Sequence, residues 1–329
     1  MIWSAVAMPP LSPGAIKSGG MAAALQIGMT SGMQRVSHAM PRFRYSAKHG
    51  DLIGAHLSTK GGLHTVFERA SAVNASAIAL FAKNSNQWKG KELTDDDCAL
   101  FAKMRTVRPV FTHTSYLINL ATTNPEFHRK SIAAMIDELD RAERLGAAAV
   151  VLHPGAHMGA GVSAGIDQIA RSLDQIHASL PDHRVVTLLE TSAGQGSCVG
   201  CSFEELGQII NLVDERRRVG VCFDTCHVFA SGYDLRSSDA YERAVEQLDA
   251  AVGVRNVGLF HLNDSKKPLG SRVDRHEHIG DGQLGLEAFR LLLNDQRFRG
   301  IPKLLETPKK IEHESDRRNL RTLRSLLAA

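Results

Sequence analysis

The sequence is poor in cysteine and has no long apolar run, and each shortage excludes a class of protein. Five cysteines among 329 residues are an odd and small number, so we expect no disulfide framework and predict an intracellular protein. No uninterrupted apolar run reaches the roughly eighteen residues that a transmembrane helix needs, so we expect no membrane partner. Fifteen histidines, by contrast, are more than a core requires and indicate metal binding.

Acidic residues are absent from residues 1–50, which lack hydrophobic periodicity and are rich in Met, Ser, Gly, Ala and Pro. This composition predicts a disordered N-terminal extension. Its five basic residues are Lys17, Arg35, Arg42, Arg44 and Lys48. An over-extended start is one interpretation, because in-frame methionines follow at positions 21, 29, 33 and 40, and it fits a cytoplasmic protein of bacterial type. A transit peptide is the other interpretation, since such segments are basic and acid-poor, and it would direct the protein to mitochondria or another organelle.

Outside this extension the positive and negative charges nearly cancel. Without those five residues, 34 Lys or Arg face 35 Asp or Glu, a balance of −1. A domain with this balance is not broadly basic. It would therefore bind nucleic acid through a local face, or with help from bound cations.

Short apolar runs alternate with amphipathic stretches from residue 51 to 329, and we interpret this part as one catalytic domain. The apolar runs predict strands at 52–57, 77–82, 109–112, 149–152, 185–189, 220–223, 257–260 and 303–305. The amphipathic stretches predict helices at 63–74, 95–107, 125–145, 163–179, 203–215, 238–252, 285–294 and 312–328, with Thr94, Ser202 and Ser238 as N-caps. Eight strand–helix pairs predict an α/β fold whose parallel sheet closes into a TIM (β/α)8 barrel. A doubly wound open sheet is the alternative.

Metal-binding side chains stand at or just beyond the ends of the predicted strands from the third to the eighth. They are five histidines and four carboxylates: His113, His153, Glu190, Asp224, His227, His261, Asp274, His276 and Glu306. In a barrel these strand ends share the C-terminal face, where such folds place their chemistry. Burying so many polar groups without ions would be costly, so the pattern predicts a metal cluster at that face. His56 ends the first strand and is left out of the ligand set.

The stretch 261–285 supplies three of these residues. Because residues two apart in an extended segment point the same way, Asp274 and His276 can bind one ion while Arg275 points elsewhere. Nine ligands are too many for one four-coordinate metal and suit two or three ions. Close pairs of metals are the usual device for phosphoester hydrolysis, and three divalent ions would make the barrel mouth attractive to DNA.

Six distinctive motifs follow one another along the domain. They are IGAH at 53–56, HTSYLINL at 113–120, HPGAH at 153–157, ETSAGQG at 190–196, DTCHVFASGYD at 224–234 and HLNDSKKPLGSRVDRHEHIGDGQLG at 261–285. With them, residues 53–307 resemble the endonuclease IV family, the zinc-dependent apurinic/apyrimidinic endonucleases of base-excision repair. The resemblance implies three Zn²⁺ per chain, with Mn²⁺ as an alternative in some sites.

The same resemblance assigns the nine ligands to three ions. His113, His153 and Glu190 would hold the first ion. Glu190 would bridge to the second, which Asp224, His261 and Glu306 would complete. His227, Asp274 and His276 would hold the third.

The resemblance also implies the reaction and the partner. A hydroxide between the first two ions would attack the phosphodiester 5′ to an abasic site in double-stranded DNA, leaving a 3′-OH and a 5′-deoxyribose phosphate. Glu190 and Glu306 would be catalytic, Glu190 as the bridge and Glu306 by orienting the attacking water. Tyr116, Gln195 and Arg275 lie where the family contacts DNA, with the abasic nucleotide flipped out of the helix. We also expect removal of blocked 3′ ends, and a monomer.

One position departs from the family pattern. The loop after the second strand carries Asn86 where the family often has an Arg that inserts into the base stack. Asn is shorter and uncharged, so we expect weaker binding to kinked DNA. Lys83 or Lys89 would compensate by contacting the DNA backbone.

Two other functions use some of the same features. A sugar isomerase or epimerase barrel with one or two divalent ions would not need the set His227, Asp274 and His276. A protein that only binds damaged DNA would not need metals that share a hydroxide. The pair Cys198 and Cys201 has the spacing of a redox motif but lies in a glycine-rich loop, which does not favour a redox function.

Overall fold

The computed structural model describes residues 43, 45, 52–309 and 313–328. Of the predicted extension, residues 1–50, all but Phe43 and Tyr45 lie outside the described residues. None of the described helices is long and apolar enough to cross a membrane.

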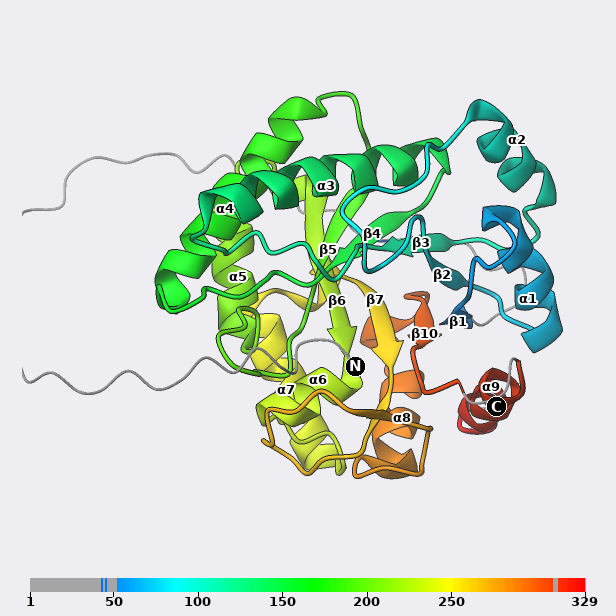
Figure 1. Cartoon of the computed structure of the whole chain (residues 1–329). Helices are drawn as coiled ribbons and strands as arrows, with labels where there is room; N and C mark the ends of the chain where they lie inside the picture. Colours follow the sequence, from blue (N-terminus) through cyan, green and yellow to red (C-terminus); the bar gives the residue numbers. More distant parts are fainter. Residues whose placement is uncertain (1–42, 44, 46–51, 310–312, 329) are drawn as a thin grey trace, which may run out of the picture. The chain divides into compact units, whose positions relative to one another are not determined.

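Eight parallel strands close into a barrel (Figure 1). They are β1 (Ile53–His56), β2 (Ile78–Phe81), β3 (Val110–His113), β4 (Ala149–Leu152), β5 (Val186–Glu190), β6 (Val219–Asp224), β7 (Val257–Leu262) and β10 (Lys303–Leu305). Each strand pairs with the next along the chain, and β10 pairs with both β7 and β1 to close the ring. The predicted TIM barrel is confirmed, and the open-sheet alternative is wrong.

Helices surround the barrel, and consecutive ones such as α3, α4 and α5 pack side by side (Figure 1). The described α-helices are α1 (Val66–Val73), α2 (Asp95–Met104), α3 (Pro125–Arg144), α4 (Val162–Ser179), α5 (Phe203–Leu212), α6 (Thr225–Ser231), α7 (Ser238–Ala251), α8 (Gly285–Asn294) and α9 (Glu314–Ser325). Short 3₁₀ helices are η1 (Leu63–Thr65), η2 (Arg216–Arg218), η3 (Val254–Asn256) and η4 (Gln296–Phe298).

Polar caps begin several of these helices. The Thr94 hydroxyl accepts from the backbone N–H of Asp97, whose carboxylate accepts from the N–H of Thr94, so the start of α2 is a capping box. Ser202 caps α5 as predicted. The cap of α7 is Ser237 rather than the predicted Ser238, because the Ser237 hydroxyl is the one that reaches a free N–H of the first turn.

Two short elements follow strands at the C-terminal face of the barrel. Helix α6 begins directly after β6, with Asp224 as its N-cap. A two-stranded antiparallel hairpin follows β7 and consists of β8 (Asp264–Ser265) and β9 (His276–Glu277). Neither was predicted, and both carry candidate metal ligands or their neighbours.

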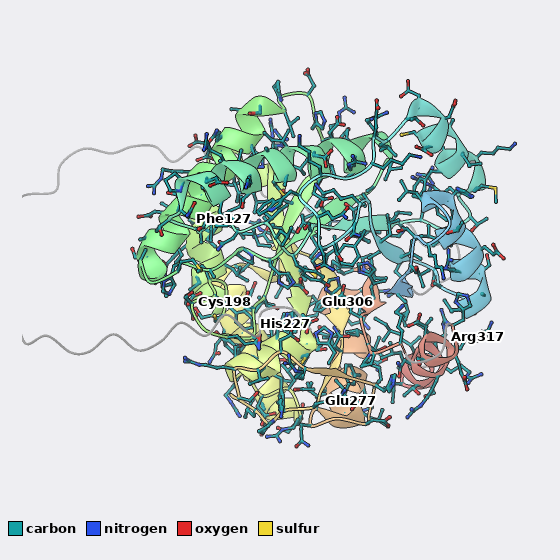
Figure 2. All side chains as sticks on the ribbon, in the orientation of Figure 1. Phe127, Cys198, His227, Glu277, Glu306 and Arg317 are labelled. Carbon is teal, nitrogen blue, oxygen red and sulfur yellow. The ribbon has the colours of Figure 1, made fainter. Side chains whose placement is uncertain are left out.

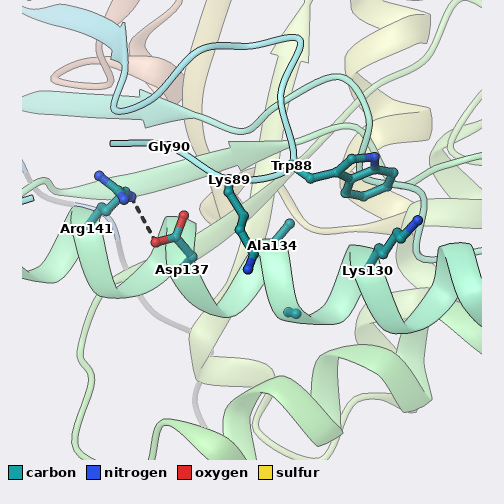
Figure 3. Close-up of a pocket in the computed structure, with 8 residues that line it drawn as sticks. Trp88, Lys89, Gly90, Lys130, Ala134, Asp137 and Arg141 are labelled. Carbon is teal, nitrogen blue, oxygen red and sulfur yellow. Dashed lines mark hydrogen bonds and ion pairs between the residues drawn. The ribbon is translucent and has the colours of Figure 1, made fainter. Parts of the chain in front are cut away.

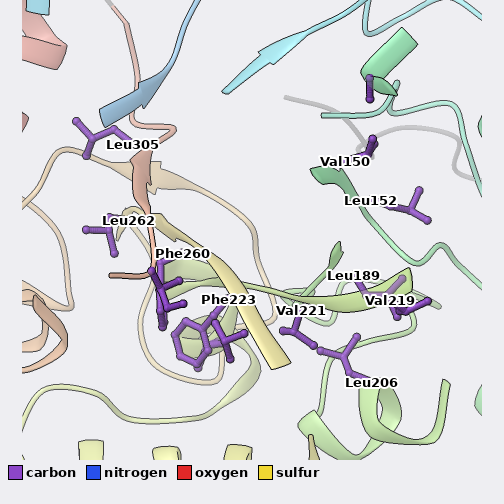
Figure 4. Packing of buried hydrophobic residues seen from close by; sticks show 14 of the residues in the cluster. Val150, Leu152, Leu189, Leu206, Val219, Val221, Phe223, Phe260, Leu262 and Leu305 are labelled. Carbon is purple, nitrogen blue, oxygen red and sulfur yellow. The ribbon is translucent and has the colours of Figure 1, made fainter. Parts of the chain in front are cut away.

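The barrel strands bury both faces. Outward-facing residues such as Val150, Leu189 and Val221 pack against the surrounding helices, where Leu206 of α5 is one of the contacts (Figure 4). Inward-facing residues form a second apolar cluster inside the barrel: Ala77, Ala79, Phe111, Ala149, Val151, Leu188, Cys222, Leu259 and Leu304. Burial on both faces explains why these strands appear in the sequence as continuous apolar runs.

Phe43 and Tyr45 pack against this inner cluster and belong to the barrel. The Tyr45 ring meets Phe111 edge-on, with ring centroids 5.5 Å apart. A side chain on Gly220 would come within 2.6 Å of the Phe43 ring, so the absence of one on that strand makes room for Phe43. Two residues of the predicted extension, Phe43 and Tyr45, therefore contribute to the barrel core.

Candidate metal centre

Six of the nine predicted ligands continue the inward-facing rows of the barrel strands. Side chains two apart on a strand share a face, so a ligand two positions after an inner apolar residue also points inward. The pairs are Phe111 and His113, Val151 and His153, Leu188 and Glu190, Cys222 and Asp224, Leu259 and His261, and Leu304 and Glu306. The remaining three come from α6 (His227), from the β8–β9 loop (Asp274) and from β9 (His276).

The first group contains His113, His153 and Glu190, whose potential ligand atoms all lie within 4.8 Å of one another. Glu190 Oε2 is 3.2 Å from His113 Nε2 and 3.3 Å from His153 Nε2. His113 Nδ1 is 2.9 Å from the carbonyl oxygen of Thr114, which holds the ring so that Nε2 faces the group.

The second group contains Glu190, Asp224, His261 and Glu306, also within 4.8 Å of one another. His261 Nδ1 lies between two carboxylates, 2.6 Å from Glu190 Oε1 and 3.1 Å from Glu306 Oε2. Glu190 thus turns one oxygen to the first group and the other to the second, as a bridging carboxylate would.

The third group contains His227, Asp274 and His276. Asp274 Oδ1 is 3.4 Å from His227 Nε2 and 3.2 Å from His276 Nε2, and the two imidazole nitrogens are 3.4 Å apart. Asp224 lies within 4.8 Å of both histidine nitrogens, so this group adjoins the second. Figure 2 shows His227, which belongs to α6, and Glu306, which follows β10, on the same side of the barrel.

The charges of these groups depend strongly on one another. Burial opposes ionisation of Glu190, yet His153, His261 and the other facing imidazoles hold its pKa well below its ordinary value. Burial likewise opposes protonation of His276, yet Asp224 and Asp274 raise its pKa to about 9. Burial lowers the pKa of His153, whereas neighbouring carboxylates raise those of His227, His261 and His276, so these three supply the positive charge that the carboxylates require in the metal-free chain. Nitrogen and carboxylate donors with this need for positive charge fit divalent metal ions.

The centre is closed below and open on one side. The side chains of Glu190 and His261 have no exposed surface, whereas those of His153 and Asp274 are 31% and 40% exposed. A large substrate would therefore approach past His153 and Asp274.

His56, left out of the predicted ligand set, contacts the centre through Glu306. Its Nδ1 is 3.0 Å from Glu306 Oε1. The ring is buried, and Nε2 has no hydrogen-bond partner. Its place at the end of the first strand was the only signal in the sequence, and that position alone does not distinguish a ligand from a residue that holds one.

The residues predicted to contact DNA lie on loops around this centre. The Tyr116 ring is 5.8 Å from the ring of His113 and 6.1 Å from that of His153, between centroids. Arg275 is half-buried beside Asp274, whose carbonyl oxygen accepts from its guanidinium at 2.7 Å. Gln195 is half-buried in the β5–α5 loop, where its carbonyl oxygen accepts from the N–H of Cys198.

Asn86 is exposed in the loop after β2, and that loop is joined to the loop of Tyr116. The carbonyl oxygen of Ser85 accepts from the N–H of Tyr116 at 3.0 Å and from the hydroxyl of Ser115 at 2.8 Å. The N–H of Asn86 donates to the Asn84 side chain, which shapes the turn. Hydrogen bonds therefore connect the two loops that carry Asn86 and Tyr116.

Lys83 is not available to DNA, contrary to our prediction. Its side chain is 1% exposed, and its ammonium lies 2.7 Å from Asp137 and 3.5 Å from Glu138 of α3. It holds the loop to the helix instead. Lys89 is exposed and lines a pocket of about 330 Å³ on the outside of the barrel with Trp88 and Lys130 (Figure 3).

All five cysteines are free thiols. Burial raises the pKa of the Cys201 thiol to about 12, and it also raises the pKa of Cys198. Such thiols are poor nucleophiles at neutral pH. Cys226 lies close to Asp274 and His276, but burial raises its thiol pKa to about 12 as well.

Comparison with known proteins agrees with this geometry. A family model of xylose isomerase-like TIM barrels matches residues 67–326. The probable endonuclease 4 of Geobacter sulfurreducens is 46% identical over 280 residues, covering 84% of this chain and 95% of the relative. The crystal structure of endonuclease IV from Thermus thermophilus is 34% identical, with a TM-score of 0.74 over 83% of this chain and 98% of that chain. A D-tagatose 3-epimerase-like protein, 19% identical with a TM-score of 0.64 over 83% of this chain and 96% of its own, shares the fold alone. The chain therefore belongs to the endonuclease IV family.

Proposed function

We propose that this DNA-repair nuclease hydrolyses the phosphodiester 5′ to an abasic site in double-stranded DNA. The products would be a 3′-OH and a 5′-deoxyribose phosphate. The observation that carries the proposal is the arrangement of nine His and carboxylate side chains in adjoining groups that share Glu190 and Asp224. Such a set suits hydrolysis of a phosphodiester assisted by several metals.

We infer that the three groups would hold three Zn²⁺ ions, or Mn²⁺ in some of the sites. None of the nine residues is a cysteine, and imidazole with carboxylate suits either metal. When bound, such ions lower the pKa of water and neutralise charge on the phosphate. Glu190 contacts His113 and His153 through one oxygen and His261 through the other. It therefore belongs to both of the deepest ligand groups and holds them next to each other.

Glu306 is the carboxylate that we assign to the attacking water. Burial opposes its ionisation, but His261 and His56 hold its pKa well below the ordinary carboxyl value. It therefore stays ionised at neutral pH and can accept a hydrogen bond from water. With 17% of its side chain exposed, it is also more accessible than Glu190, which is fully buried.

The DNA contacts in this proposal come from the rim of the centre. Tyr116 and Arg275 flank the open side, and Gln195 and Asn86 lie on the neighbouring loops. A blocked 3′ end presents the same phosphodiester to the same groups, so we propose removal of such ends as a second activity. Free thiols throughout support our proposal of a cytoplasmic enzyme, and we propose that it acts as a monomer.

A sugar isomerase or epimerase remains the second candidate, because barrels of that kind share the fold. The third group, His227, Asp274 and His276, favours the nuclease. A one- or two-metal epimerase has no use for a third set of ligands that lies 3.2–3.4 Å apart and open to solvent on the Asp274 side.

Incision of a duplex that contains one abasic analogue tests the proposal. We expect a single cut 5′ to the analogue, no cut in the undamaged duplex, loss of cutting with a chelator and recovery with added Zn²⁺. Elemental analysis should find about three divalent ions per active chain. Activity that survives complete metal removal, or turnover of a ketose with no incision, would contradict the proposal.

A further inference from the structure

Asn263 connects two of the candidate ligands and is itself buried. It follows β7 and has no exposed surface. Its side-chain Nδ2 donates to Asp224 Oδ2 at 2.6 Å, and its Oδ1 accepts from the backbone N–H of Glu306 at 3.0 Å. One amide therefore joins the ends of β6 and β10 across the end of β7.

The two neighbours determine which way this amide points. A backbone N–H can only donate, so the amide oxygen must face Glu306. The nitrogen then faces the carboxylate of Asp224, which can only accept while it is ionised. Exchanging the two atoms would break both contacts, so the orientation does not depend on the way the amide is drawn.

Asp224 is held from two sides by this arrangement. Its Oδ1 accepts from the N–H of His227 at 2.9 Å, and its Oδ2 accepts from Asn263. The Thr225 hydroxyl donates to the carbonyl oxygen of Asn263 at 2.7 Å and accepts from its N–H at 2.9 Å. The backbone of Asn263 is thus as well held as its side chain.

We propose that Asn263 is a positioning residue for the metal centre, holding Asp224 and Glu306 at the separation that the second ligand group requires. This inference rests on the proposed function, because it takes that group to be a metal site. Partners that orient ligands in this way typically contribute a factor of about 10 to 100 in metal affinity.

Metal binding by the full chain tests this role apart from activity. Asn263→Ala removes both contacts, and Asn263→Ser is a second variant in case the first does not fold. The matched control is Asn256→Ala at the other end of β7, where a buried amide donates to the carbonyl oxygen of Val252 at 2.6 Å. Each metal-free protein is checked by circular dichroism and then titrated with Zn²⁺ against a competing chelator.

We expect both Asn263 variants to bind one of the ions, that of the second ligand group, about 10- to 100-fold less tightly than the wild type. Asn256→Ala should be destabilised to heat but should keep the wild-type isotherm. Wild-type affinity in a folded Asn263 variant would overturn the inference, as would an equal loss in Asn256→Ala. If the wild-type protein itself binds no Zn²⁺, the proposed function fails instead, so the two failures are distinguishable.

Discussion

Glu190 is the residue on which the two deepest ligand groups depend, because its oxygens face both. We expect Glu190→Gln to fold and yet to lose incision activity by at least about 100-fold, since a direct ligand should matter more than an outer partner. The amide has one oxygen in place of two and no charge, so one of the two groups loses its donor. The measurement is single-turnover cleavage of the abasic duplex together with metal content. Glu287→Gln, an exposed carboxylate paired with Arg290, is the control, and near-normal cleavage by Glu190→Gln would exclude the bridging role.

His56 contacts Glu306 through Nδ1, and two substitutions separate the roles of its two nitrogens. The amide nitrogen of Asn occupies about the place of Nδ1, whereas that of Gln occupies about the place of Nε2. We therefore expect His56→Asn to keep most of the cleavage rate and His56→Gln to lose about 10- to 100-fold. Rates for both variants at saturating enzyme are the measurement. The reverse order would show that Nε2, which has no partner in the described structure, is the nitrogen that matters.

The nature of the ligands could be predicted residue by residue, whereas burial and pairing could not. Histidines and carboxylates at strand ends carry their own chemical signal. For Lys83 the residue type was misleading, because a lysine in a loop is ordinarily exposed to solvent and this one is buried. Its partners, Asp137 and Glu138, lie on α3 more than fifty positions away, and no local pattern connects them.

At the scale of elements, we propose that the loop after β2 contributes to the affinity for kinked DNA. We expect Asn86→Arg to bind an abasic duplex about tenfold more tightly at low salt, because a guanidinium can stack on exposed bases as well as pair with phosphate. Cleavage at saturating enzyme should not change. Binding titrations at several salt concentrations are the measurement.

Gln87→Arg is the control for added charge in the same loop. It should tighten binding less, and its effect should disappear at high salt. Equal gains in the two variants would show that charge alone acts there. If Asn86→Arg does not tighten binding, another residue inserts into the base stack, and Tyr116 is the next candidate.

Hydrophobic periodicity predicted every barrel strand to within two residues, because each is buried on both faces and bounded by polar loops. Helix α6 was missed because six of its seven residues are buried, which leaves no polar face to mark a helix. The β8–β9 hairpin was missed because its strands have two residues each, too few for an alternating pattern. Both elements pack together at the barrel mouth, and only α6 has a local signal, the N-cap Asp224.

For the whole molecule, stability without metal should depend on pH through the histidines of the centre. Their carboxylate neighbours raise the pKa of His276 to about 9, above its ordinary 6.5, and also raise that of His227. A raised folded-state pKa contributes stability that is fully present below about pH 6.5 and is lost as the pH rises through about 9. The metal-free protein should therefore lose roughly 1–2 kcal/mol of unfolding free energy between pH 6.5 and 8.

Urea denaturation with a chelator at the two pH values is the measurement. His276→Gln should weaken the dependence. With saturating Zn²⁺ the sign should reverse, because metal binding requires neutral imidazole and improves as the pH rises. A metal-free protein that is more stable at pH 8 would contradict the charge assignment.

Two truncations test where the barrel begins. Residues 1–42 lack hydrophobic periodicity, so we expect their removal to leave the melting temperature unchanged. Removing residues 1–49 also takes away Phe43 and Tyr45 from the inner apolar cluster, and the loss of two partly buried aromatic side chains should cost about 2–4 kcal/mol. Thermal melts of the two proteins are the measurement, and equal melting temperatures would show that these two rings add nothing.

The bridging arrangement of the centre has a consequence for biosynthesis. Six of its nine candidate ligands stand at the ends of successive barrel strands from β3 to β10, and the group that contains both Glu190 and Asp224 is complete only with Glu306. A nascent chain can therefore not assemble that group until the last barrel strand has left the ribosome. An ion of that group could therefore bind only after ring closure, whereas the group of His113, His153 and Glu190 needs no residue of β10. A chain that stops before β10 would lack the carboxylate of Glu306 beside the buried His261, which favours its unfolding and removal by proteases.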